Sequence, residues 1–128
     1  MCFCRTSKHQ VDNNSSKVVY KVMRLISTAK VMPLHYYTNR YYSIGSTIRA
    51  SKDVSTADMD KLTIFEGEVV HAYTSKYKAT AVIIQIQEFV NHPLVIVKCK
   101  IPLGIPYWIN EDAMEIAAKE MKIINIGF

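Results

Sequence analysis

Glycine and proline are scarce in this sequence, with four residues of each among 128. No set of glycines has the spacing of a phosphate-cradling loop or of a dinucleotide-binding turn. The nucleophile elbow Gly-x-Ser-x-Gly and the zinc-binding pattern His-Glu-x-x-His are missing as well. The chain therefore lacks the motifs by which nucleotide-hydrolysing, dinucleotide-dependent and common hydrolytic enzymes are recognised.

Cysteine is also rare, and the number is odd: Cys2, Cys4 and Cys99. The Cys2-x-Cys4 spacing does not match the usual zinc patterns and no second pair completes it, so we expect neither a metal site nor a cofactor. No apolar run approaches the roughly 20 residues of a transmembrane helix, and no secretory signal peptide opens the chain. These features predict a cytoplasmic protein that does not enter a membrane.

Positive charge is in excess, and it is unevenly distributed. The net charge is +5. Residues 1–64 carry ten Lys and Arg against four Asp, whereas residues 65–128 carry six Lys against seven acidic residues. A basic half of this kind favours an anionic partner, although solvated surface lysines alone would give the same count.

Apolar alternation predicts a domain rich in strands. Residues 17–27 and 94–101 are the clearest strands, and the second places Cys99 on one face with Lys98 and Lys100 on the other. Further strands are expected at 68–74, at 107–109 and at 121–126. Turns are expected at Gly45 and Gly104.

Helical periodicity is strongest in residues 75–91, where Ser75 is placed to cap the start and Pro93 stops continuation. Residues 55–62 offer a short helix, and residues 111–120 have helix-forming composition. The sequence thus predicts a polar tail at 1–16 and a single α+β domain at 17–128. We expect a curved antiparallel or mixed sheet with one main helix packed on a face.

The most suggestive cluster combines aromatic and basic side chains between residues 35 and 42. Tyrosine rings stack on bases and arginine pairs with phosphate, and the same residue types are enriched in protein interfaces. Packing of some of these tyrosines on the sheet is the structural alternative. His71, between apolar neighbours, is either a core histidine or a ligand-binding group at a strand end. Acidic pairs such as Glu66 and Glu68 are interpreted as solvated surface, so no catalytic residue is assigned.

Short pieces of the chain resemble a group of small uncharacterised α+β proteins of phages and bacteria. They are Val19-Tyr20-Lys21-Val22, Val70-His71-Ala72-Tyr73 and Cys99-Lys100-Ile101-Pro102, together with Tyr41-Tyr42 and Ile44-Gly45. This resemblance implies a phage-type protein that counteracts a host defence system by binding. A fainter resemblance is to ADP-ribosyltransferase-like domains, in which His71 and Tyr41 or Tyr42 would surround NAD. The Gln85-Ile86-Gln87-Glu88 segment departs from the spacing of the catalytic glutamate in that family.

We therefore expect a non-enzymatic binding protein that sequesters an anionic nucleotide or blocks an acidic host protein. An NAD-dependent transferase is the alternative, and a nucleic-acid-binding protein ranks third because the net charge is small. A homo-oligomer is compatible with the many tyrosines. The expected ligand-binding residues are Lys21, Arg24, Tyr36, Tyr37, Arg40, Tyr41, Arg49 and His71.

Overall fold

The computed structural model of the chain describes residues 2–4, 10–11, 16–34, 41–50, 63–65, 70–110 and 112–127. The predicted short helix at 55–62 lies outside the described residues. The described elements, in chain order, are β1 (Cys2–Cys4), β2 (Gln10–Val11), β3 (Lys17–Ser27), β4 (Lys30–Pro33), β5 (Thr47–Arg49), β6 (Thr63–Phe65), β7 (Val70–Tyr73), α2 (Lys76–Ile86), the 3-10 helix η1 (Gln87–Phe89), β8 (Leu94–Ile101), β9 (Tyr107–Asn110), β10 (Glu115–Ala118) and β11 (Glu120–Ile126).

Nine of the described strands form one antiparallel sheet. Eight of them follow one another in the order β2-β9-β10-β7-β3-β8-β11-β5, and the ninth, β4, pairs with residues 23–27 of β3. The predicted strands at 17–27 and 94–101 are confirmed with those bounds and pair with each other over eight residues. Two segments of the predicted tail also form strands: β2 pairs with β9, and β1 pairs with β6 in a separate two-stranded sheet.

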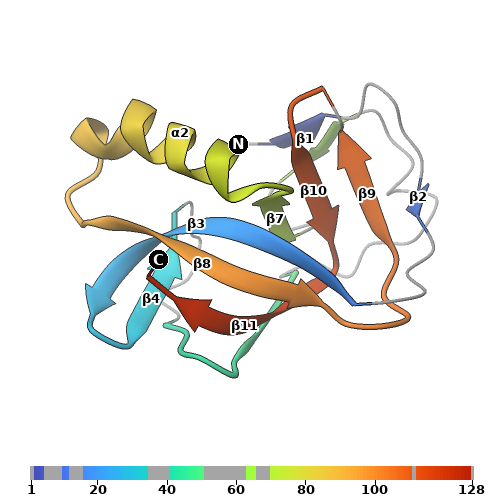
Figure 1. The fold of residues 1–128 in the computed structure, drawn as a ribbon, viewed down its shortest axis with the longest axis horizontal. Coiled ribbons are helices and arrows are strands. Elements are labelled where there is room, and N and C mark those ends of the chain that lie inside the picture. Colours follow the sequence, from blue (N-terminus) through green and yellow to red (C-terminus); the bar gives the residue numbers. More distant parts are fainter. Residues whose placement is uncertain are drawn as a thin grey trace.

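The sheet bends sharply beside β3. Strand β3 pairs with β8 along most of its length, but with β7 it shares only the Tyr20–Tyr73 pair. Strands β7, β9 and β10 consequently turn away from the direction of β3, β8 and β11 (Figure 1). Side chains from both parts of the bent sheet, such as Ile116 of β10 and Ile123 of β11, pack into one core, and we call that side of the sheet the concave face and the other side the convex face.

The concave face holds the larger core. Alternate residues of β3, β8, β10 and β11 meet there because side chains on a strand point to opposite faces in turn. The fully buried members with the largest side chains include Met23, Ile101, Ile116, Met121 and Ile123. Burial of each such side chain contributes about 1.5–3 kcal/mol to the stability of the fold.

The convex face is covered in part by α2, as the helical periodicity of residues 75–91 predicts. Ser75 caps the helix, and its hydroxyl accepts a hydrogen bond from the main-chain N–H of Lys78 at 3.1 Å. Ala79 and Val82 are buried against Val22 and Ile96 of the sheet. The helix lies along β3 (Figure 1).

Residues 111–120 do not form the helix that their composition favours. Glu115–Ala118 is strand β10, inserted between β7 and β9. Ile116, Ala117 and Ala118 are fully buried there. Two flanking strands offer these residues both hydrogen-bond ladders and burial, and this tertiary environment outweighs the intrinsic helix propensity of Ala and Glu.

The part of the chain that the structure describes contains no helix long and apolar enough to cross a membrane.

Candidate functional site

Three lysines stand together on the part of the convex face that α2 leaves open. Lys98 and Lys100 lie two residues apart on β8, and Lys122 of β11 is directly opposite Lys100 in the register. Their strand neighbours Cys99 and Ile123 point into the core, which fixes the lysines on the outer side. We call Lys98, Lys100 and Lys122 the lysine face.

This arrangement costs stability in the absence of a ligand. Lys100 and Lys122 are both exposed, and Lys98 is partly exposed. Side chains directly opposite each other in an antiparallel pair have Cβ atoms only about 5 Å apart, and like charges in that position repel. A bound anion would neutralise this repulsion.

Two residues before Lys122, on the same face of β11, the cross-strand pair has opposite charges. Glu120 is opposite Arg49 of β5, and Arg49 Nε donates to the Glu120 carboxylate at 3.1 Å. On one face of β11, therefore, Glu120 forms a complementary pair with β5 on one side of the strand, and Lys122, two residues along, forms a like-charge pair with β8 on the other side. Arg49, predicted as a ligand-binding residue, borders the lysine face but has a carboxylate partner of its own.

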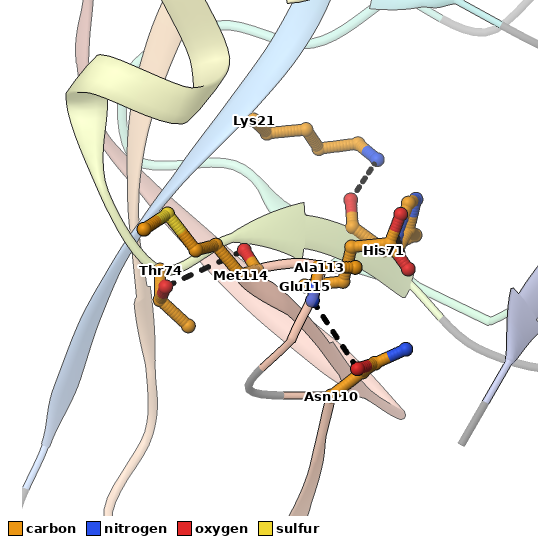
Figure 2. A network of polar contacts seen from close by, with 7 residues as sticks. All are labelled: Lys21, His71, Thr74, Asn110, Ala113, Met114 and Glu115. Atoms are coloured by element: carbon orange, nitrogen blue, oxygen red, sulfur yellow. Dashed lines mark hydrogen bonds and ion pairs between the residues drawn. The ribbon is translucent and has the colours of Figure 1, made fainter. Parts of the chain in front are cut away.

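Lys21 has a structural partner. It lies on the concave side, in the alternation of Val19 and Met23. Its Nζ donates to the main-chain oxygen of His71 at 2.6 Å, as Figure 2 shows. This bond crosses the place where the β3–β7 ladder ends, so Lys21 satisfies a carbonyl at the bend of the sheet.

Arg24 is also held within the fold. It is buried, with 9% of its surface exposed, and its Nε donates to the main-chain oxygen of Pro33 at 3.0 Å. This bond ties β3 to β4. Lys21, which is half-buried, and Arg24, which is buried, thus both donate to main-chain oxygens within the fold, and their predicted role in ligand binding stays a prediction.

His71 belongs to a polar cluster on the convex side of β7. Its Nε2 lies 3.7 Å from a carboxylate oxygen of Glu115, and its ring meets that of Tyr73 edge-on with centroids 5.4 Å apart. Burial, and secondarily the nearby Glu115 carboxylate, raises the pKa of Tyr73 from 10.0 to about 12. Tyr73 is consequently a neutral phenol at physiological pH.

The turn between β9 and β10 supports this cluster. Asn110 is buried, and its Oδ1 accepts from the Ala113 N–H at 3.3 Å. Met114 has a φ of 55°, in the left-handed region, and its main-chain oxygen accepts from the Thr74 N–H at 2.9 Å. Figure 2 shows Thr74 and Asn110 on either side of the turn. The turn thus anchors the end of β7 just before α2 begins.

Of the tyrosines in the predicted aromatic and basic cluster, the structure describes Tyr41 and Tyr42. Tyr36, Tyr37 and Arg40 lie outside the described residues. Tyr41 is exposed, whereas Tyr42 pairs with Val31 and packs against the concave core.

Tyr42 and His71 therefore lie on opposite faces. Val70 and Ala72 belong to the core against which Tyr42 packs, and strand alternation directs His71 to the other side. The structure does not bring Tyr42 beside the His71 ring, and the likeness to ADP-ribosyltransferase-like domains, which also named Tyr41, stays a prediction.

The sequence interpretation missed the lysine face. The available signal was the pair Lys98 and Lys100 at alternate positions of the strand predicted at 94–101, together with Lys122 in the strand predicted at 121–126. The like-charge pairing of Lys100 with Lys122 depends on the register between β8 and β11, which local sequence does not encode.

Comparisons with protein-family models, with curated proteins and with solved structures find no match. Among the described residues no group of three His, Cys, Asp or Glu side chains is placed to hold a metal ion.

Proposed function

We propose that this protein is a non-catalytic binding domain that holds the phosphate backbone of a single-stranded nucleic acid on its lysine face. The observation that carries the proposal is the like-charge pair Lys100–Lys122, with Lys98 beside it, on an open sheet surface. Lysine is a common phosphate ligand, and phosphate contacts supply most of the affinity in sequence-independent nucleic-acid binding.

The shape of the surface favours a polymer over a mononucleotide. Small ligands are usually bound in concave sites with convergent polar groups. The three lysines form instead an open right-angled group on a pleated surface, with Lys98 and Lys100 about 7 Å apart along β8 and Lys122 about 5 Å from Lys100 across to β11. Successive phosphates of one chain can contact such spread-out charges.

The chemistry of the surface favours nucleic acid over an acidic protein. Lysine is depleted in the centres of protein interfaces, where aromatic residues and Arg are enriched instead. A single strand is favoured over a duplex because β8 and β11, which carry the lysines, are inner strands of a wider sheet, flanked by β3 and β5. The major groove of a duplex admits a helix or a two-stranded ribbon, not a sheet of that width.

The test is fluorescence anisotropy with a labelled oligothymidylate over a series of salt concentrations. If three lysines contact phosphates, the logarithm of the binding constant falls with the logarithm of salt with a slope of about −2. Lys100→Gln and Lys122→Gln should each weaken binding about tenfold and make the slope shallower by about 0.7. Lys30→Gln, an exposed lysine at the start of β4, is the matched control and should change neither quantity.

Competition experiments distinguish a nucleic acid from a mononucleotide and from an acidic protein as the partner. Unlabelled oligothymidylate should displace the probe, whereas adenosine triphosphate and polyglutamate should do so only at much higher charge concentration. Equal competition by the mononucleotide would favour a nucleotide-sequestering protein, and equal competition by polyglutamate would favour an acidic protein partner. Either result would overturn the proposal.

A further inference from the structure

The outward side of α2 carries an uncovered apolar surface. Tyr77 and Ile84 on the helix, and Phe89 on η1, are 81%, 76% and 78% exposed. The buried side of the same helix already packs on the sheet through Ala79 and Val82. These exposed residues therefore contribute nothing to the core of the monomer.

The exposed residues have a self-complementary spacing. Tyr77, Ala81, Ile84 and Glu88 follow one another at intervals of four, three and four residues. Such intervals place Tyr77, Ala81 and Ile84 on one stripe of α2, as in the contact seam of paired helices, and Glu88 continues the pattern in η1, directly after α2 ends at Ile86. The stripe has the same intervals read in either direction, as an isologous contact between two antiparallel copies requires.

From the palindromic spacing we infer that the α2 stripe is the contact surface of a symmetric dimer, with the helices of two copies packed antiparallel. In this register Ala81 of one copy faces Ile84 of the other, so a small side chain receives a large one. Tyr77 faces Glu88 of the second copy, where the phenol can donate to the carboxylate.

The charges of the helix support the same orientation. Lys76 and Lys78 stand in the first turn, which has no acidic residue, and Glu88 follows the C-terminal end of α2. Each charge opposes the dipole of its own helix, which is positive at the N-terminus and negative at the C-terminus. An antiparallel second copy brings Glu88 to the end that carries Lys76 and Lys78, and it also aligns the two helix dipoles favourably.

The size of the surface predicts a weak dimer. The eleven residues of α2 span only about 16 Å. Two aromatic side chains and one isoleucine offer about 500 Å² per copy, below the roughly 800 Å² of a standard interface. Association should therefore depend on concentration, and the lysine face plays no part in it.

Sedimentation velocity of the protein without nucleic acid, from micromolar to millimolar concentration, tests the inference. We expect a monomer–dimer equilibrium in the wild type and at least a tenfold weaker one in Ile84→Glu. The matched control is Leu103→Glu, which changes another exposed apolar residue, in the β8–β9 connection, and should leave the equilibrium unchanged.

A charge exchange tests the antiparallel orientation. Glu88→Lys should weaken the dimer, and adding Lys76→Glu and Lys78→Glu to it should restore the dimer. A wild type that stays monomeric at millimolar concentration, or a dimer insensitive to Ile84→Glu, would overturn the inference. A monomer that instead binds neutral lipid vesicles through Ile84 would assign the stripe to a membrane surface and overturn it equally.

Discussion

At the scale of single residues, Tyr73 connects burial to a measurable pH dependence. Its phenol is enclosed between β3, β10 and α2, and burial is the main cause of the rise of its pKa to about 12. In the unfolded chain the pKa returns to about 10. Below pH 10 the phenol is neutral in both states, whereas between pH 10 and 12 only the unfolded chain releases the proton. Stability that is present below pH 10 is therefore lost as the pH rises through this window.

The variant Tyr73→Phe should remove this loss. Because phenylalanine does not ionise, its stability relative to wild type should increase by about 2 kcal/mol between pH 9 and pH 11.5. Urea unfolding of both proteins across this pH range measures the difference in stability. Because both proteins carry the same lysines, the effect of lysine titration on stability is common to them and cancels in the difference. Tyr77→Phe, at an exposed tyrosine, is the control that should follow the wild-type curve. Parallel curves for Tyr73→Phe and wild type would mean that Tyr73 is open to solvent.

At the scale of elements, the β8–β11 pair combines a stabilising core with a destabilising surface. Its inner side buries Cys99 and Ile123, and its outer side opposes Lys100 to Lys122. Substitution of Lys100 by glutamate would convert the repulsive pair into a complementary one like Arg49–Glu120.

Lys100→Glu should raise the free energy of unfolding by about 0.5–1 kcal/mol and at the same time abolish binding of the oligothymidylate. Stability and function then change in opposite directions, which a purely structural role for the lysines would not produce. Thermal or urea unfolding gives the first quantity, and anisotropy gives the second. Lys30→Glu should lower affinity only slightly, through net charge, without a gain in stability. A variant that is more stable and still binds as well as wild type would separate the lysine face from the function.

The elements also show which parts of the fold could be predicted. Strands at 17–27 and 94–101 and the helix after Ser75 follow from local alternation, periodicity and capping, which act over a few residues. Strand β10 could not be predicted, because its alanine-rich sequence becomes a strand only when β7 and β9 flank it. The lysine face could not be predicted for a similar reason. Each lysine is visible in the sequence, but Lys122 comes close to Lys100 only through strand pairing between residues more than 20 positions apart in the chain.

At the scale of the whole molecule, the fold depends on how the bend between β3 and β7 is closed. The two parts of the sheet share the concave core, yet the ladder between them contains only the Tyr20–Tyr73 pair. Backbone groups at such a break need other partners, because buried and unsatisfied carbonyls are costly. The Lys21 amine supplies one of these partners at His71. A cation that the sequence analysis assigned to a ligand thus joins the two parts of the sheet.

Lys21→Met tests this assignment. Methionine preserves most of the apolar stem of lysine but removes the amine, so the His71 carbonyl loses a charged donor and the protein should lose about 1–3 kcal/mol of stability. Binding of the oligothymidylate by the folded variant should be unchanged, because Lys21 lies on the concave side and the lysine face on the convex side. Lys100→Met should give the reverse result, with weaker binding and unchanged or slightly increased stability. If Lys21→Met were as stable as wild type and bound more weakly, Lys21 would be a ligand-binding residue, and the bend of the sheet would be held by the shared core alone.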